Sequence, residues 1–206
     1  MTRRPDVYGT ARGRIRARLA SPLAARARAR RHERFFTLTG LTAGMRVVDI
    51  GCGALGLRAL EPELDITGVD VVARPVYPGP FVQADATRRL PFDDGAFDLA
   101  YTSSVIEHVH PSRRAGFAAE VQRVARGWFV QTPARSFPIE PHALLPFAHW
   151  LAPTLRRPYW RLGAAGAWED IHLLRRAELA ELFGEPVLAE RFGGLVKSWI
   201  ALRPVG

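Results

Sequence analysis

Residues 47–56 read VVDIGCGALG, an apolar run that ends in an acid and leads into three glycines. A short apolar run of this kind is typical of a buried strand in a parallel sheet, and it carries Asp49 to the carboxyl edge, where open α/β sheets bind ligands. Gly51 and Gly53 permit a tight turn and close approach of the backbone to a ligand. A helix is expected to start near Leu55, with its free N–H groups pointing at the same place. The sequence therefore predicts a ligand site after the first strand.

Further β-like runs alternate with helix-like stretches along the chain. Besides residues 46–50, strands are expected at 64–69, 81–83, 97–101 and 128–132, helices over 111–124 and 171–183, and two closing β runs at 187–192 and 197–203. Alternating strands and helices indicate an α/β fold with a parallel sheet covered by helices on both faces. The glycine pair Gly193-Gly194 between the closing runs favours an antiparallel hairpin at the C-terminus.

The basic charge of the chain is concentrated at one end. Residues 1–34 hold eleven arginines and two acids, while the remaining 18 basic and 18 acidic residues cancel, so this segment carries the whole net charge of +9. We expect a basic helical extension over residues 1–36, with a second helix starting at Pro22, and a globular domain over residues 37–206. Three interpretations of the extension stay open: a solvated leader, a patch for anionic lipid or nucleic acid, and an organellar transit peptide.

Cysteine content and hydropathy place the chain among soluble domains. Cys52 is the single cysteine, which excludes an internal disulfide, and it is expected to be a small buried side chain rather than a nucleophile. No apolar stretch approaches the ~20 residues that span a bilayer. These features favour a cytoplasmic protein.

Acids recur at the ends of the expected strands. Asp49 stands two residues before Gly51, where a dinucleotide pyrophosphate would prefer no negative charge, although Gly51, Gly53 and Gly56 also fit the G-x-G-x-x-G dinucleotide pattern. A ligand with an ammonium or sulfonium group suits this acid better. Asp70 closes the second strand, where an acid can accept both hydroxyls of a ribose. Asp85 follows the third strand and can accept from the exocyclic amine of adenine.

These residues carry a resemblance to a known family. Over residues 45–109 the sequence resembles the class I S-adenosylmethionine-dependent methyltransferases of the type 11 family, in VVDIGCGALG, in GVD and in QADATRRLPFDDGAFDLAYTSSVIEHV. The resemblance implies a Rossmann-like, seven-stranded sheet, S-adenosylmethionine as cofactor, and transfer of its sulfonium methyl to a nucleophile. One departure is Leu55, which stands where the family usually has its third glycine, with Gly56 one residue later. Carried over, the cofactor-binding residues are Asp49, Gly51, Gly53, Asp70, Val71, Asp85, Ala86, Thr102 and Ser103.

Residues 133–160 break the alternation and are rich in proline, aromatic residues and histidine, so we expect an inserted cap there. His108 follows the fourth strand, near the expected position of the methyl group, and Glu140 and His142 lie in the cap. These three are the candidates for a catalytic base or for an acceptor-orienting pair. Because no pair of side chains has convincing metal-ligand spacing, no metal is predicted.

The composition of the cap bears on the methyl acceptor. Residues 143–160 combine leucine, phenylalanine, tryptophan and tyrosine with Arg156 and Arg157, which suits a lid over an apolar acceptor and also a membrane-interface segment. The first hypothesis is a small apolar or amphipathic acceptor such as a lipid, quinone, glycolipid or polyketide-like metabolite, with peripheral contact to anionic membrane through residues 1–34 or the cap. The alternatives are an RNA or protein methyltransferase that uses the arginine-rich leader, and a non-catalytic cofactor-binding scaffold. Nucleic acid is the less favoured partner because few aromatic residues accompany the arginines.

Overall fold

The computed structural model describes residues 33–163 and 171–206. The chain divides into two compact units, residues 1–38 and 39–206. In the first unit, residues 33–38 are helical, and the rings of Phe35 and Phe36 meet edge to face with centroids 5.6 Å apart. The rest of the expected N-terminal extension, including the helix starting at Pro22, lies outside the described residues.

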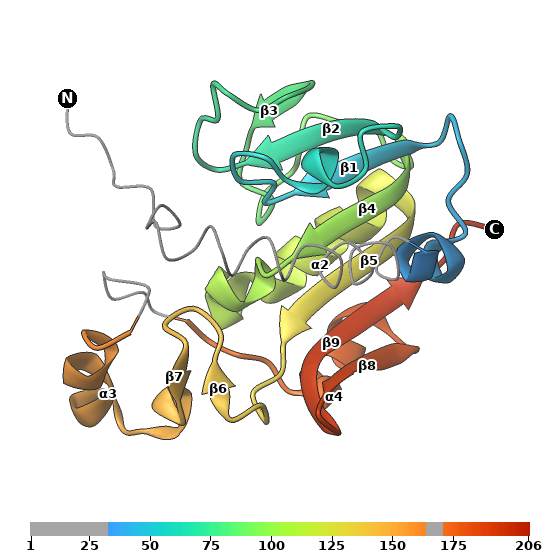
Figure 1. Cartoon of the computed structure of the whole chain (residues 1–206). Helices are drawn as coiled ribbons and strands as arrows, with labels where there is room; N and C mark the ends of the chain where they lie inside the picture. The colour runs from blue at the N-terminus through green and yellow to red at the C-terminus, as the bar shows by residue number, and fades with distance from the viewer. Residues whose placement is uncertain (1–32, 164–170) are drawn as a thin grey trace, which may run out of the picture. The chain divides into compact units, whose positions relative to one another are not determined.

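The second unit is built on one seven-stranded sheet (Figure 1). The strand order is β3-β2-β1-β4-β5-β9-β8; β1 to β5 run parallel, β9 is antiparallel to β5, and β8 is antiparallel to β9. This confirms the predicted α/β class and the mostly parallel sheet that ends in an antiparallel hairpin. The strands are β1 (Arg46–Ile50), β2 (Asp65–Asp70), β3 (Phe81–Gln83), β4 (Phe97–Ser103), β5 (Ala125–Pro133), β8 (Val187–Phe192) and β9 (Leu195–Arg203).

The hairpin turn lies at the predicted glycine pair. Gly193 and Gly194 have φ angles of 56° and 81°. Two successive residues with positive φ make a turn whose twist matches that of the flanking strands, and glycine adopts this conformation at no steric cost. The two glycines therefore determine where the closing strands reverse.

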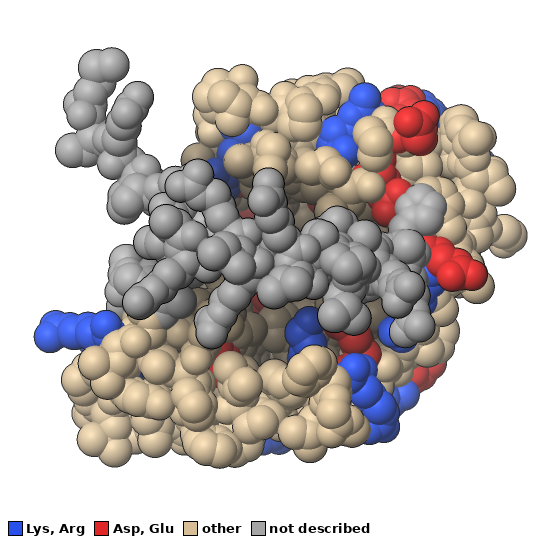
Figure 2. Space-filling view, viewed as in Figure 1, with Lys and Arg blue, Asp and Glu red and all other residues tan. Residues whose placement is uncertain are grey.

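The inserted segment after β5 folds around its own small core. It contains β6 (Ile139–Glu140) paired antiparallel with β7 (Leu145–Pro146), the 3-10 turn η4 (Ala148–Trp150) and helix α3 (Pro153–Trp160), and it lies beyond the end of β5 (Figure 1). We call residues 134–163 the cap. The cap presents mostly uncharged side chains at the lower left of Figure 2. Its core consists of Ala143, Leu145, Ala148 and Trp160, which pack with Ile171 and Leu173.

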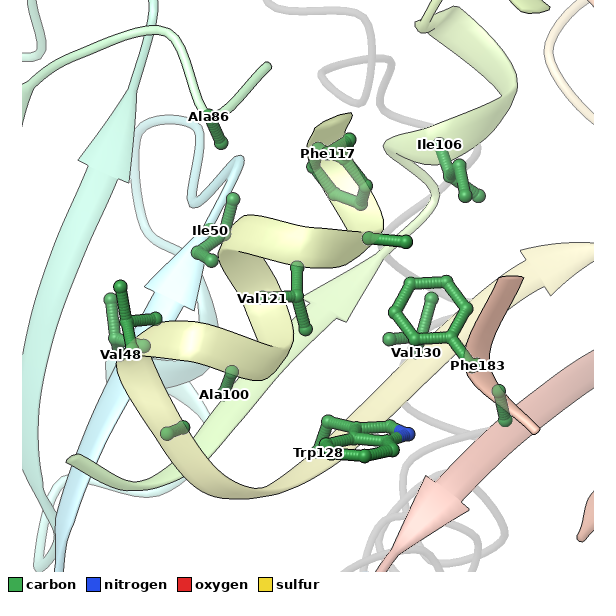
Figure 3. Packing of buried hydrophobic residues seen from close by; sticks show 14 of the residues in the cluster. Val48, Ile50, Ala86, Ala100, Ile106, Phe117, Val121, Trp128, Val130 and Phe183 are labelled. Atoms are coloured by element: carbon green, nitrogen blue, oxygen red, sulfur yellow. The ribbon is translucent and has the colours of Figure 1, made fainter. Parts of the chain in front are cut away.

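The main core lies between the sheet and helix α2 (Arg114–Val124), which follows the 3-10 turn η3 (Pro111–Arg113). Phe117 and Val121 of α2 are fully buried in one cluster with Val48, Ala100 and Val130 of the strands (Figure 3). Side chains in such a cluster are removed from water, which is the dominant favourable term in folding. The core holds β1 and β4 side by side and so fixes the edge at which both strands end.

Two predicted helices differ from the observed ones. The closing helix α4 spans Arg176–Phe183 rather than starting at residue 171, because Leu174 instead forms a parallel β-bridge with Ala134. The helix expected near Leu55 is reduced to the single 3-10 turn η1 (Leu57–Ala59). Pro62 follows closely, and the residue before a proline is disfavoured in helical conformation. No helix within residues 33–163 and 171–206 is long and apolar enough to cross a membrane.

Candidate functional site

The turn after β1 is built by glycines that no other residue could replace without displacement. Gly51 has a φ of 77°, and a Cβ atom there would lie 2.3 Å from Cγ2 of Val105. Gly56 has a φ of 56°, and a Cβ atom there would lie 2.2 Å from Oδ2 of Asp49. Leu55 points into solvent, with 60% of its surface exposed. The turn therefore tolerates the one-residue shift of its third glycine, because Gly56 is the residue that lies close to Asp49 while the Leu55 side chain extends into solvent.

Asp49 lies beneath this turn and is almost inaccessible to water. Its Oδ2 accepts a hydrogen bond of 2.6 Å from the backbone N–H of Leu57. Burial raises the pKa of the Asp49 carboxyl to about 6; the Leu57 hydrogen bond opposes this rise and the negative charge of Asp70 adds to it. A carboxyl group with this pKa changes charge near neutral pH, so a cation bound beside it would favour the ionised form.

Asp70 ends β2 and ties the glycine turn to the neighbouring strand. Its Oδ2 accepts from the backbone N–H of Gly53 at 3.0 Å and lies 3.0 Å from the Arg74 guanidinium, while its Oδ1 accepts from the backbone N–H of Val72 at 2.9 Å. Val71, next to Asp70, is more than half exposed. The Asp70 carboxylate thus lies against the glycine turn, as expected for a ribose-binding acid.

The residues after β3 and β4 have their own partners. Oδ1 of Asp85 accepts from the backbone N–H of Thr87 at 2.9 Å and from its hydroxyl at 2.8 Å, and the backbone hydrogen bond is the main reason that the pKa of Asp85 is lowered. Ala86 is buried beside it. Thr102 is also buried, and its hydroxyl has no hydrogen-bond partner among the described residues. The hydroxyl of Ser103 instead donates to Oε1 of Gln131 on β5, at 3.2 Å.

The three catalytic candidates come together with a fourth residue, Glu107. His108 and Glu107 lie on the 3-10 turn η2 (Ile106–His108) after β4, and the rings of His108 and His142 meet edge to face with centroids 4.9 Å apart. Nδ1 of His142 is 2.8 Å from Oε1 of Glu140, and Nε2 of His142 is 3.8 Å from Oε1 of Glu107. We call Glu107, His108, Glu140 and His142 the Glu–His cluster. It joins the edge of the sheet to the cap.

Both carboxylates of the Glu–His cluster are buried and held in place. Oε2 of Glu140 accepts from the backbone N–H groups of His142 and Ala143, at 2.9 and 2.5 Å. Burial acts to raise the pKa of Glu140, but the hydrogen bonds from His142 and Ala143 outweigh it and the pKa is lowered. Oε2 of Glu107 accepts from the hydroxyl of Thr132 on β5 at 3.0 Å, and burial raises the pKa of Glu107. The pKa values of the two acids are therefore shifted in opposite directions, although both carboxyl groups lie beside the same His142 imidazole.

Sequence reasoning missed Glu107 as a site residue. Its only sequence signal was its place beside His108 in IEHV. Its role depends on complete burial and on contact with Thr132 and His142, which come from β5 and from the cap. No local sequence pattern predicts contacts of this kind.

Two cavities lie on different sides of the molecule. One of about 300 Å³ lies between the cap and the sheet, lined by Trp150 of η4, Leu174, Trp199 of β9, Ser136 and three arginines, Arg135, Arg175 and Arg176. Another of about 510 Å³ is lined by Arg46, Thr67 and Phe97, at the amino-terminal ends of the strands and away from the glycine turn. Of these two cavities, the one beside Trp150 adjoins the cap. Nε1 of Trp150 donates to the backbone carbonyl of Arg135 at 2.9 Å, which holds this indole at the cavity wall.

Comparison with known proteins identifies the domain. The model of the type 11 methyltransferase domain family matches residues 48–130, which include the glycine turn, Asp70, Asp85 and η2. No curated protein matches the sequence.

Solved structures share the fold at low sequence identity. A protein from Pyrococcus horikoshii is 16% identical, with 98% of this chain and 94% of that chain covered and a TM-score of 0.59. A SAM-dependent methyltransferase from Methanosarcina mazei is 17% identical, with 79% and 92% covered and a TM-score of 0.52. A putative methyltransferase from an antibiotic biosynthesis pathway of Anabaena variabilis is 19% identical, with 80% and 64% covered and a TM-score of 0.52. These likenesses show the fold.

Proposed function

Residues 48–130 are a class I S-adenosylmethionine-dependent methyltransferase domain of the type 11 family, and from this premise we propose that the enzyme methylates a small apolar or amphipathic acceptor. The observation that carries the acceptor class is the cavity of about 300 Å³ between Trp150 and Trp199. The face of the cap seen in Figure 2 is mostly uncharged. The exposed wall surface of the cavity is mainly apolar, but Arg135, Arg175 and Arg176 also line the cavity, so the lining suits an amphipathic acceptor with an apolar body and a polar or anionic group.

The cofactor is proposed to lie across the carboxyl ends of β1, β2 and β4. Gly51 and Gly53 would lie against its methionine part, with Asp49 below as a counter-charge. Asp70 would accept hydrogen bonds from the ribose hydroxyls. The Arg74 guanidinium, which now lies beside Oδ2 of Asp70, would then share this oxygen with the ribose or move away from it. Val71, Asp85 and Ala86 would border the adenine, and Thr102 and Ser103 the reacting end.

Methyl transfer needs alignment of the acceptor with the sulfonium methyl and exclusion of water. In the displacement, an acceptor lone pair forms the bond to the methyl carbon while the carbon–sulfur bond breaks, and S-adenosylhomocysteine leaves. If the acceptor is a hydroxyl, it also loses a proton. Because Glu140 holds Nδ1–H of His142, Nε2 carries the lone pair that can take that proton, and His108 packs beside the ring.

Cofactor affinity should depend on pH through Asp49. A bound cation favours the ionised carboxyl, so binding below the pKa of about 6 must expel a proton. About a tenth of such groups are ionised at pH 5 and about nine-tenths at pH 7, so affinity should rise about tenfold between these values. Calorimetric titration of S-adenosylmethionine at pH 5, 6 and 7 measures this. In Asp49→Asn the slope should vanish; a slope of the same size in this variant would assign the dependence to another group.

The acceptor class is tested by changing the cavity wall. Trp150→Ala and Trp199→Ala should each raise the KM for a long-chain phenol or hydroxyquinone about tenfold, because a buried aromatic side chain contributes ~1.5–3 kcal/mol of transfer free energy when an apolar ligand covers it. The Kd for S-adenosylmethionine should stay unchanged. Phe192→Ala is the matched control, since Phe192 is a large exposed aromatic residue outside the cap.

The same assay, run with radiolabelled cofactor, separates the other acceptors. RNA and protein acceptors are offered at 50 and 200 mM salt, and anionic vesicles are added to the small-molecule reaction. If RNA alone is methylated, and its methylation falls steeply at the higher salt, the small-molecule proposal is wrong. The enzyme would then be an RNA methyltransferase that binds its substrate through the arginine-rich leader. Cofactor binding without turnover on any acceptor would favour a scaffold. Unchanged activity with vesicles would remove the membrane contact.

A further inference from the structure

Three potential metal ligands meet where the cap joins the sheet. One carboxylate oxygen of Glu107 and one ring nitrogen each of His108 and His142 all lie within 4.8 Å of one another. Sequence spacing gave no metal-ligand pair because Glu107 and His108 are neighbours on η2 while His142 comes from the cap. The fold brings them together.

Two atoms of the cluster face each other, Nε2 of His142 and Oε1 of Glu107. An ionised Glu140 can only accept, so Nδ1 of His142 carries a proton, and in the neutral ring Nε2 then carries the lone pair that a metal ion requires. Nε2 lies 3.8 Å from Oε1 of Glu107, which is longer than a hydrogen bond. Oε1 of Glu107 is completely buried and has no hydrogen-bond partner among the residues that the structure describes. A buried oxygen left in this way is costly unless a cation or a donor meets it.

The groups behind these atoms are those that support metal ligands. Glu140 orients His142 through Nδ1, which is the carboxylate–histidine arrangement that fixes the tautomer of a metal-binding imidazole. Thr132 donates to the second oxygen of Glu107 and so aims Oε1 at the gap. His108, in contrast, is exposed and leaves the cluster open to solvent on one side. The arrangement therefore has two fixed ligands, one accessible ligand and a path of entry.

We propose that Glu107, His108 and His142 bind one divalent transition metal ion. Two imidazoles and one carboxylate favour zinc, cobalt or iron over magnesium, which prefers oxygen ligands. Three protein ligands leave positions for an oxygen of another molecule.

The role of the ion rests on the proposed function. An acceptor hydroxyl bound to the ion would be acidified by its charge and would lose its proton to solvent. Its oxygen would then form the bond to the methyl carbon as the carbon–sulfur bond of the cofactor breaks and S-adenosylhomocysteine leaves. His142 is then a ligand, and the ion takes over the activation that His142 would otherwise supply as a base.

Metal binding is tested on the full chain without an affinity tag, after treatment with a chelator. Titration with Co²⁺ should give visible d–d absorption that saturates at one ion per chain, and Zn²⁺ should displace it. Glu107→Gln and His142→Ala should each weaken binding about 100-fold, since even supporting groups of a metal site contribute 10–100-fold. His110→Ala is the matched control, because His110 is a nearby exposed histidine bonded to Ser112; its affinity should stay within twofold of wild type.

Different results would contradict the metal site and the proposed methyltransferase function. Binding below one ion per chain, or binding that Glu107→Gln leaves unchanged, would overturn the metal site and leave His142 as an imidazolium between two carboxylates. Circular dichroism checks that each variant is folded; should Glu107→Gln unfold, His108→Ala at the exposed position must show the loss. Since Co²⁺ is titrated without cofactor or acceptor, failure to methylate any acceptor would remove the proposed function while leaving the metal result intact.

Discussion

Asp70→Ala is expected to weaken S-adenosylmethionine binding by two to three orders of magnitude. The Asp70 carboxylate ends β2 against the glycine turn, and both of its oxygens accept hydrogen bonds there. A hydrogen bond to a charged group contributes ~1.5–3 kcal/mol, and two ribose hydroxyls held by this carboxylate would contribute about 3–4 kcal/mol if each bond lies in the lower part of that range. Calorimetric titration of S-adenosylmethionine and S-adenosylhomocysteine should show the same loss for both ligands, because both carry the ribose.

Two controls separate ribose binding from damage to the turn. Asp65→Ala removes an exposed acid from the amino-terminal end of the same strand and should leave affinity unchanged. Arg74→Met removes the ion pair with Asp70 while keeping the carboxylate, so a loss in this variant as large as in Asp70→Ala would trace the effect to the pair. A Kd for Asp70→Ala within threefold of wild type would refute the ribose contact.

Gly51→Ala is expected to destabilise the protein by about 3 kcal/mol or more and to abolish cofactor binding. The new methyl group adds two costs: left-handed backbone for a residue with a Cβ, ~1–2 kcal/mol, and overpacking, ~1–3 kcal/mol. The second cost follows from the 2.3 Å approach to Cγ2 of Val105. Urea unfolding measures the stability, and cofactor titration measures the binding.

Gly95→Ala is the matched control for backbone strain alone. Gly95 has a φ of 64°, and a Cβ atom there would meet nothing within 4 Å. This variant should therefore lose only about 1–2 kcal/mol and bind cofactor normally. Equal losses in Gly51→Ala and Gly95→Ala would mean that Val105 moves aside and that the turn is not tightly packed.

The sheet could be predicted because each strand has a short local sequence pattern. β1 and β8 begin and end at the predicted residues, since glycines follow each of them directly: Gly51 after β1 and the pair Gly193-Gly194 after β8. The closing helix was predicted too long because residues 171–175 have the apolar content of a helix. Their actual partner is Ala134, far away in the chain, and a long-range bridge of this kind leaves no local trace.

The proximity of the glycine turn and its two acids could be predicted from the sequence, while their role in cofactor binding stays a prediction. Asp49 and Asp70 lie at the carboxyl ends of β1 and β2, which the parallel sheet brings to one edge, and the Gly53 N–H bonds to Asp70 there. The candidates His108 and His142 were recognised singly, but their meeting depends on how the cap folds back onto η2. Glu107 was missed because its importance comes from burial and from Thr132, which only the assembled structure shows.

The separate small core of the cap bears on how this enzyme can diversify. Ala143, Leu145, Ala148 and Trp160 bury one another with Ile171 and Leu173, apart from the cluster that holds α2 on the sheet. Substitutions in packed regions that share no partners have nearly additive effects on stability, so changes confined to this small core should leave the stability contributed by the main core nearly unchanged. The lining of the cavity at Trp150 can then vary from one descendant sequence to another while the glycine turn stays constant. New acceptors become accessible to such a protein without rebuilding the half that supplies the methyl group.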